Sequence, residues 1–309
     1  MKIKFWGVRG SIPTPGTDTV KYGGNTTCLE VLSSKGDEYI LDAGTGIRVL
    51  GLDMLCRDKY KKKPIEAKIL ISHVHWDHIQ GWPFFVPAYM PNNRFQIYGG
   101  ARSKVKLEET LVGQKENQTL KATIENATMN KVTNHAFEMQ QSRYVFPVRL
   151  EQMASNILFN DLKNGHFIQN NLDISFRQFT DMHPDGIVSY KLSENRTTFV
   201  YATDVEHNKQ DEEFIEWIRD ADVLYFDGQY LPEEYKNGKQ GWGHSTYEKA
   251  VDFCLAANVK YVVLGHHEPT HNDIMLDKKL DLANRYLISK KGASKLHIAL
   301  AREGQELYI

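Results

Sequence analysis

Three histidines and an aspartate stand close together directly after an apolar segment of the chain. The run LISHVHWDHIQGW contains His73, His75, Asp77 and His78. Histidine accounts for only 12 of the 309 residues, so this density is not expected by chance. Imidazole nitrogens bind zinc and neighbouring transition metals, and a carboxylate adds charge to such a site. The spacing predicts a metal site, and the alternative is a polar loop of hydrogen-bonded histidines.

The spacing within this run favours two metal ions rather than one. His73 and His75 are two residues apart, so on extended backbone their side chains point to the same side. The chain must then turn, and Asp77 and His78 can face a second position. Two complete sites need more ligands, which the sequence offers where other apolar runs end. These further candidates are His183, Asp204, His266 and His267.

Strand and helix patterns alternate along the chain that must position these residues. Strands are predicted at 2–8, 27–33, 38–44, 66–72, 172–179, 187–193, 197–204, 222–228, 260–266, 295–301 and 306–309. Helices are predicted at 46–60, 148–156, 211–220, 245–257 and 273–290. Ser245 is the expected N-cap of the helix that begins there. Strands at both ends of the chain with helices between them predict two sheets packed face to face and covered by helices.

Residues 1–309 are interpreted as a single domain that carries a polar insertion. The segment from about 101 to 143 is rich in Asn, Gln and Thr and only weakly periodic. We expect it to be a lid or an oligomer contact, for instance in a homodimer, rather than an element of the fold.

Composition and charge limit the class of protein. Hydrophobic residues make up 41% of the chain and charged residues 25%, as in ordinary soluble proteins. The 38 basic and 39 acidic residues give no overall attraction to nucleic acid or to anionic membranes. Three well-separated cysteines fit reduced thiols, and neither a signal peptide nor a membrane span is apparent. We therefore expect a cytoplasmic protein that does not bind membranes.

The chain resembles the metallo-β-lactamase superfamily, whose HxHxDH motif is matched by His73, His75, Asp77 and His78. The N-terminal GVRGSIPTPG and the run LDAGTG are also typical of that family. The resemblance implies a four-layer αββα sandwich, an α/β fold. It also implies two divalent metal ions, with zinc the default and manganese or iron compatible with the same ligands.

The resemblance distributes the ligands between the two ions. It places His183 with His73 and His75 on the first ion, and Asp77, His78 and a late histidine on the second, with Asp204 bridging both. The family's strand-then-histidine register favours His266 over His267 as the late ligand. Asp42 in LDAGTG would orient a ligand histidine, or else it caps the turn before the next helix.

A second segment indicates one branch of this superfamily. FDGQYLPEEYKNGKQGWGHSTYEKA resembles the phosphodiesterase branch, which includes ribonuclease Z and its bacterial relatives. The resemblance carries over Asp227 and His244. A protonated His244 would either stabilise the phosphoryl oxygen or protonate the leaving group, and Asp227 would hold the orientation of His244. Ribonuclease Z generally has Glu after His at the first position, whereas Phe226 precedes Asp227 here. Alternatively, His244 only packs beneath GWG. The predicted catalytic residues are thus Asp77, His244 and Asp227.

Two adjacent metal ions lower the pKa of a shared water and neutralise charge on the group it attacks. The sequence therefore predicts a dinuclear metal-dependent hydrolase, and specifically a phosphodiesterase for a small or cyclic nucleotide-like substrate. The ribonuclease Z-like alternative is weaker because its tRNA-gripping arm lies between the fourth histidine and the bridging aspartate. His183 and Asp204 are only 21 positions apart, so a nucleic acid polymer is not favoured as a partner. A thioesterase or lactonase, and a non-catalytic metal-bound sensor, are further alternatives.

Overall fold

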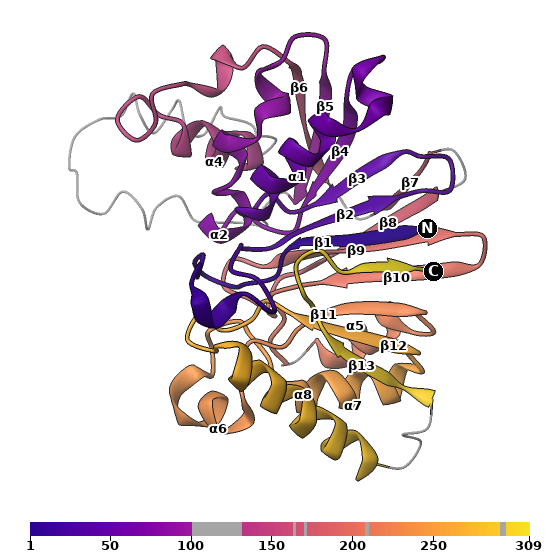
Figure 1. Cartoon of the computed structure of the whole chain (residues 1–309). Helices are drawn as coiled ribbons and strands as arrows, with labels where there is room; N and C mark the ends of the chain where they lie inside the picture. Colours follow the sequence, from indigo (N-terminus) through magenta and orange to yellow (C-terminus); the bar gives the residue numbers. More distant parts are fainter. Residues whose placement is uncertain (101–131, 163–164, 170–171, 208–209, 291–294) are drawn as a thin grey trace, which may run out of the picture.

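The computed structural model describes residues 1–100, 132–162, 165–169, 172–207, 210–290 and 295–309. Two seven-stranded sheets pack face to face, and helices cover both outer faces (Figure 1). Apolar side chains such as Phe5, Leu70, Tyr190 and Phe199 fill the space between the sheets and are fully buried. The predicted four-layer αββα sandwich is therefore confirmed.

The first sheet is built mainly by the N-terminal half of the chain. Its order is β14 (Glu306–Tyr308), β1 (Lys2–Gly7), β2 (Cys28–Leu32), β3 (Glu38–Leu41), β4 (Glu66–Ile71), β5 (Arg94–Gly100) and β6 (Asn156–Leu162). The strands from β14 to β3 pair antiparallel, and those from β3 to β6 pair parallel. Helices α1 (Gly46–Cys56) and α4 (Val132–Gln140) cover its outer face (Figure 1).

The second sheet mirrors this plan with the C-terminal half. Its order is β13 (His297–Leu300), β12 (Tyr261–Gly265), β11 (Val223–Asp227), β10 (Thr197–Ala202), β9 (Ile187–Glu194), β8 (Leu172–Phe179) and β7 (Gly165–Gln169). The strands from β10 to β13 pair parallel, and those from β7 to β10 pair antiparallel. Helices α5 (Asp211–Ile218), α7 (Tyr247–Ala257) and α8 (Asp273–Ile288) cover its outer face (Figure 1).

Short helical turns complete the connections. They are η1 (Thr17–Thr19), η2 (Asp58–Lys61), α2 (Trp76–Ile79), η3 (Trp82–Phe84), η4 (Val86–Tyr89), η5 (Leu150–Gln152), α6 (Pro232–Glu234) and η6 (Tyr235–Lys239). The turn α2 lies inside the histidine-rich run, so the chain bends between His75 and His78 as the sequence predicted.

The structure corrects two predictions around the polar segment. Residues 132–140 form α4 rather than part of an insertion, because Phe137 is fully buried and packs its ring on Trp82 and Phe159. Residues 101–131 lie outside the described residues, so the lid and homodimer interpretations stay predictions. The helix predicted at 148–156 is wrong, since only η5 is helical there and β6 begins at Asn156. The strands β5, β6 and β7 were not predicted.

The N-cap of α7 differs by one residue from the prediction. The hydroxyl of Thr246, not that of Ser245, accepts the backbone N–H of Lys249. Ser245 is fully buried, and its backbone N–H points at the carboxylate of Asp227, 3.4 Å away.

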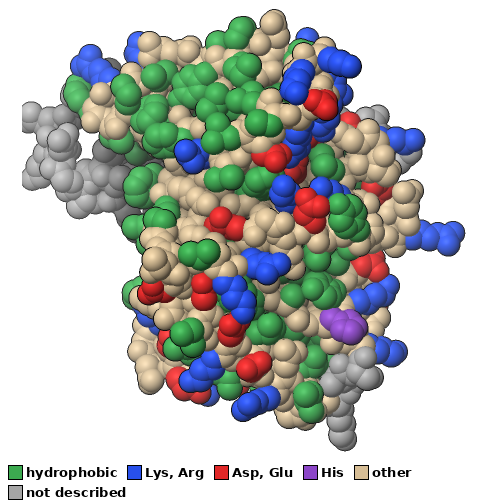
Figure 2. All heavy atoms as spheres, viewed as in Figure 1, with side chains coloured by type: hydrophobic (Ala, Val, Ile, Leu, Met, Phe, Trp, Pro, Cys, Tyr) green, Lys and Arg blue, Asp and Glu red, His purple; other side chains and the backbone are tan. Residues whose placement is uncertain are grey.

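The surface carries charges of both signs. Figure 2 shows hydrophobic side chains gathered over the half of this face formed by the first sheet and its helices, and interspersed acidic and basic side chains elsewhere. Within the parts of the chain that the structure describes, no helix is long and apolar enough to cross a membrane.

Candidate metal centre

The centre lies where parallel strands of both sheets end. The strands β3 and β4 of the first sheet, and β10, β11 and β12 of the second, each lead into a polar residue at their carboxyl end, the usual position of functional groups in such sheets. Three of these residues have left-handed backbone, with φ of 60° at Asp42, 55° at Asp204 and 53° at His266. Such angles are uncommon outside glycine and often occur at functional sites.

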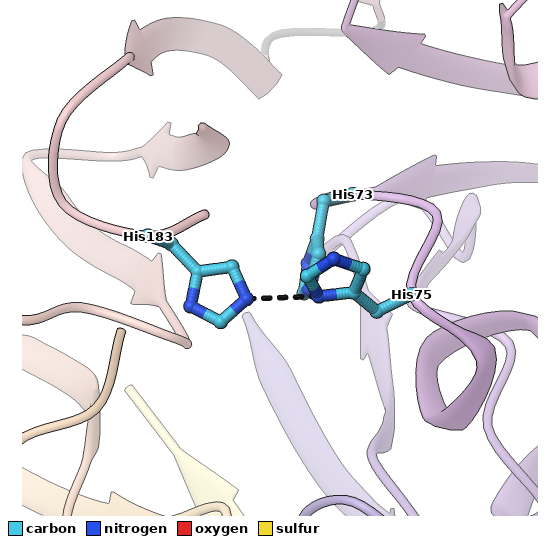
Figure 3. A group of neighbouring side chains, drawn as sticks. All are labelled: His73, His75 and His183. Atoms are coloured by element: carbon cyan, nitrogen blue, oxygen red, sulfur yellow. Dashed lines mark hydrogen bonds between the residues drawn. The ribbon is translucent and has the colours of Figure 1, made fainter. Parts of the chain in front are cut away.

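Three histidines form the first half of the centre. His73 and His75 follow β4, and His183 lies in the loop after β8; Figure 3 shows their rings converging from these two segments. Nδ1 of His75 lies 2.9 Å from Nε2 of His73 and 2.9 Å from Nε2 of His183. Three imidazole nitrogens at this spacing could hold one metal ion.

The second half joins the end of the same motif to the end of β12. Nε2 of His266 lies 3.1 Å from Oδ2 of Asp77 and 3.3 Å from Nε2 of His78. All three side chains are buried, and their ligand atoms could hold a second ion.

Asp204 stands between the two halves and turns one carboxylate oxygen to each. Its Oδ2 is 3.5 Å from Nε2 of His73 and 3.6 Å from Nε2 of His183. Its Oδ1 is 3.3 Å from Nε2 of His78 and 3.2 Å from Nε2 of His266. A carboxylate in this position could bind one ion in each half.

The donor set fits two metal ions. Four atoms bound tetrahedrally to zinc at ~2.0–2.1 Å lie roughly 3.3 Å from one another. Among the pairs given above, the separations run from 2.9 Å between ring nitrogens to 3.6 Å between His183 and Asp204. Each half offers three donors, and Asp204 adds an oxygen close to two of them in each; all are imidazole nitrogens or carboxylate oxygens.

The electrostatics of the two halves differ. Burial lowers the pKa of His73 far below its ordinary value and that of His183 to about 4, which keeps both rings neutral. Burial also opposes charge at His266, but the carboxylates of Asp204, Asp77 and Asp227 outweigh it and raise the pKa to about 9. The pKa of Asp204 lies well below its usual range in spite of burial, because histidines surround it.

Neighbouring groups orient the histidines. Nδ1 of His183 donates to the carbonyl of Gly243 at 2.9 Å, and Nδ1 of His266 donates to the amide oxygen of Gln229 at 2.9 Å. Nδ1 of His78 faces Oδ2 of Asp42 at 2.8 Å. In each case Nε2 is left for the centre, which is how protein metal sites fix ring orientation. Asp42 thus orients His78, a predicted ligand, and does not cap α1, whose N-cap is Thr45.

The predicted pair of Asp227 and His244 adjoins the second half of the centre. Nδ1 of His244 lies 2.8 Å from Oδ2 of Asp227, and the ring of His244 stacks on that of His266 at 4.9 Å. The carboxylate thus holds the ring in place, and within the described part of the chain Nε2 has no hydrogen-bond partner.

The structure separates the two adjacent late histidines. Nε2 of His267 donates to the carbonyl of Ala301 at 2.9 Å, and its ring contacts Tyr22 rather than the centre. His271 pairs with Glu234 at 2.9 Å, and His207 lies against Tyr235. The seven predicted ligands come together, and these three histidines stay outside the group.

Two supporting residues were not predicted from the sequence. Gln229, which orients His266, follows β11 by two residues. Glu206 follows Asp204 by two residues, and its carboxylate accepts three hydrogen bonds from the segment before His244. Both are single polar residues in loops. The only sequence signal for them is their position two residues after Asp227 and Asp204.

Comparison with known proteins places this centre in a family. Residues 38–267 match the family described as the Beta-lactamase superfamily domain, which is well over half of the chain. The chain belongs to the β-lactamase superfamily. The family match and the relatives below identify it as a metal-dependent hydrolase.

Curated relatives carry the name ribonuclease Z. The protein of that name from Prochlorococcus marinus subsp. pastoris is 24% identical over 91% of this chain and 93% of its own length. Ribonuclease Z of Enterococcus faecalis is 22% identical over 86% of each chain. The resemblance to ribonuclease Z seen in the sequence is thus confirmed. The expectation that nucleic acid polymers are not partners is not confirmed, since these relatives are ribonucleases by name.

Solved structures show the same fold at low identity. Human tRNase Z, short form, aligns over 100% of this chain and 99% of its own with a TM-score of 0.60 and 13% identity. A diphosphatase from the PhnP family covers 100% of this chain and 97% of its own, with a TM-score of 0.61 and 15% identity. Zinc-bound PqqB of Methylobacterium extorquens covers 100% of both chains, with a TM-score of 0.62 and 14% identity.

Proposed function

We propose that the chain is a dinuclear phosphodiesterase that acts on a small or cyclic nucleotide-like phosphodiester. The observation that carries the proposal is Asp204, whose two oxygens face two separate groups of donors at 3.2–3.6 Å. The first ion would be held by His73, His75 and His183, the second by Asp77, His78 and His266. Bound there, two divalent ions supply an activated water and neutralise the phosphate charge. Zinc is the expected metal, and manganese or iron suits the same ligands.

His244 provides the remaining chemistry from the protein side. Asp227 accepts a hydrogen bond from Nδ1 of His244 at 2.8 Å, which holds the ring in place. When the P–O bond to the leaving group breaks, Nε2 gives its proton to the departing oxygen. His244 thus acts as general acid, and Asp227 holds the ring in the orientation that this transfer needs.

Asp77 contacts both the predicted ligand set and the N-terminal loop. Its Oδ2 lies near Nε2 of His266, and it also accepts the backbone N–H of Ser11 at 2.8 Å. The N-terminal loop is thereby tied to the centre. Removal of Asp77 would therefore disturb the second ion and the loop together.

A ribonuclease Z-like nuclease is the second candidate, and the names of the curated relatives favour it. The interval between His183 and Asp204 favours the phosphodiesterase for small substrates. It is filled by β9 and β10 with their turns, which leaves no length for a tRNA-gripping arm. The net charge of −1 also gives no overall attraction to a polyanion.

Hydrolysis of bis(p-nitrophenyl) phosphate by the metal-reconstituted protein tests the proposal. We expect turnover that Asp77→Ala abolishes and that His244→Ala lowers by about 10²–10⁴-fold, the usual contribution of a general acid. His297→Gln, on the exposed side of β13, is the control and should match the wild type. Absence of turnover by protein that carries two metal ions per chain would contradict the proposal. Cyclic nucleotides and a short single-stranded RNA, assayed side by side, separate the two candidates.

A further inference from the structure

A segment that leads into His244 is held rigidly beside the centre. The carboxylate of Glu206 accepts the hydroxyl of Tyr235 and the backbone N–H groups of Gly241 and Gly243, each at 2.7 Å. The carbonyl of Gly243 accepts from the ring of His183. Three hydrogen bonds to one buried carboxylate fix a loop that would otherwise be free to move.

The backbone at the end of this segment requires glycine. Gly241 and Gly243 have φ of 81° and 85°, which side chains other than glycine rarely adopt. A Cβ on Gly243 would lie 2.0 Å from Nδ1 of His183. The chain therefore runs directly against a predicted metal ligand, and the residue between the two glycines lies at the edge of the centre.

That residue is Trp242, and its side chain is 55% exposed. Trp6, Trp82 and Trp217 are at most 8% exposed, whereas Trp76, inside the histidine-rich run, is 63% exposed. The indole of Trp242 therefore does not contribute to the core, although the backbone that carries it is fixed beside the centre. Exposed aromatic rings in fixed loops are the surfaces on which planar ligands stack.

A lysine covers one face of this indole. Nζ of Lys239 lies 3.9 Å from the ring centroid of Trp242 and 5.5 Å from that of Tyr230. The ring of Tyr230 in turn packs edge-on against His244 at 5.8 Å. Among the described residues no carboxylate pairs with the ammonium group of Lys239, so its charge is available to an anion. The ammonium group of Lys239 and the half-exposed indole of Trp242 thus lie together. The ring of Tyr230 separates them from His244.

We propose that Trp242 and Lys239 form a nucleotide-binding subsite, in which the base stacks on Trp242 and Lys239 contacts a phosphate oxygen. The subsite rests on the proposed function, because it names the part of the substrate that lies outside the reacting phosphodiester. It selects substrates with a planar base over phosphodiesters with aliphatic groups. Glu206 acts as the positioning residue of the subsite.

Binding of adenosine 5′-monophosphate and of ribose 5-phosphate to the metal-reconstituted protein, measured by calorimetry, tests the subsite. Neither compound has a phosphodiester bond, and they differ only in the base. We expect the wild type to bind the nucleotide about tenfold more tightly, within the range that base–aromatic stacking contributes. Trp242→Ala should remove this preference, whereas Trp242→Phe should keep most of it.

Lys239→Ala should lower the affinity for both compounds by the same factor, because both carry the phosphate. Lys236→Ala, an exposed lysine three residues earlier, is the matched control and should bind like the wild type. Equal wild-type affinity for the two compounds, or a preference that survives in Trp242→Ala, would overturn the subsite.

The same protein samples separate this proposal from the proposed function. Hydrolysis of bis(p-nitrophenyl) phosphate without a preference for the nucleotide contradicts the subsite alone. A preference that depends on Trp242, in protein that does not hydrolyse the diester, contradicts the phosphodiesterase alone.

Discussion

Nδ1 of His78 lies 2.8 Å from Oδ2 of Asp42, and both side chains are completely buried. The same carboxylate accepts the backbone N–H of Ser72 at 2.7 Å and the hydroxyl of Tyr201. Asp42 therefore joins β3, β4 and β10 directly behind the centre. Because Ser72 and Tyr201 fix this carboxylate, it holds His78 in one orientation, with Nε2 directed to the second half of the centre.

Asp42→Asn is expected to weaken metal binding. The amide replaces one carboxylate oxygen by an NH₂ group that cannot accept from His78, Ser72 or Tyr201. We expect the affinity for zinc to fall about 10–100-fold, the usual effect of removing such a support. Competition with a chromogenic chelator measures it. Asp58→Asn, at an exposed position in η2, is the control. An affinity equal to that of the wild type in a folded Asp42→Asn variant would contradict the role of Asp42.

His266 and His267 provide a matched pair for the ligand assignment. His266→Gln is expected to lower the metal content from two ions to one per chain, because Nε2 of His266 faces both Asp77 and Asp204. His267→Gln is expected to retain two ions and to lower stability instead, since its ring is fully buried against Tyr22 and Ala301. Metal analysis together with thermal unfolding distinguishes the two. Loss of an ion from His267→Gln alone would reverse the assignment.

The sequence was sufficient to predict the fold class and to select the residues that the structure brings together at the centre. Buried strands leave long apolar runs, and the rare ligand types directly after these runs mark the carboxyl ends of parallel strands. His73, Asp204 and His266 are all of this kind. The family's strand-then-histidine register favoured His266 over His267, and the structure places His266, not His267, beside Asp77 and Asp204.

The remaining features depend on contacts that local sequence does not encode. The sequence around Phe137 is polar, so it did not predict that the ring of Phe137 packs on Trp82 and Phe159 and holds α4 against the first sheet. Nothing in the local sequence distinguishes Gln229 and Glu206 from other loop residues. Their contacts with His266 and Gly243 form only in the folded chain. Their roles depend on pairing across the chain, which neither periodicity nor residue type reveals.

Glu206→Gln is expected to impair catalysis without loss of metal. A glutamine cannot accept all three hydrogen bonds from Tyr235, Gly241 and Gly243, so the segment before His244 loosens. We expect kcat with bis(p-nitrophenyl) phosphate to fall on the order of tenfold, the cost of a displaced catalytic group. In a His244→Ala background the same substitution should have little further effect, because the two act on one step. Additive losses in the double variant would show that Glu206 does not act through His244.

Buried Lys279 makes the stability of the protein depend on pH. Its side chain in α8 is fully buried, and Nζ donates to the carbonyls of Gly228 and Gln229 at 2.8 Å each. Burial lowers its pKa from 10.5 to about 7 in spite of the nearby carboxylates of Glu234, Asp227 and Glu268. Between pH 7 and 10.5 the unfolded chain therefore holds one more proton at this lysine than the folded chain does. Raising the pH through this window favours the folded state.

Lys279→Met is expected to remove this contribution. The free energy of unfolding of the metal-loaded wild type, relative to the variant, should rise between pH 7 and 10.5 and stay constant below pH 7. The lost hydrogen bonds to Gly228 and Gln229 shift the difference at every pH, so the slope is the informative quantity. Urea unfolding of both proteins across this range measures it, with the metal ions kept bound so that the histidines of the centre do not titrate. A difference that is flat through the window would show that Lys279 keeps its proton in the folded protein.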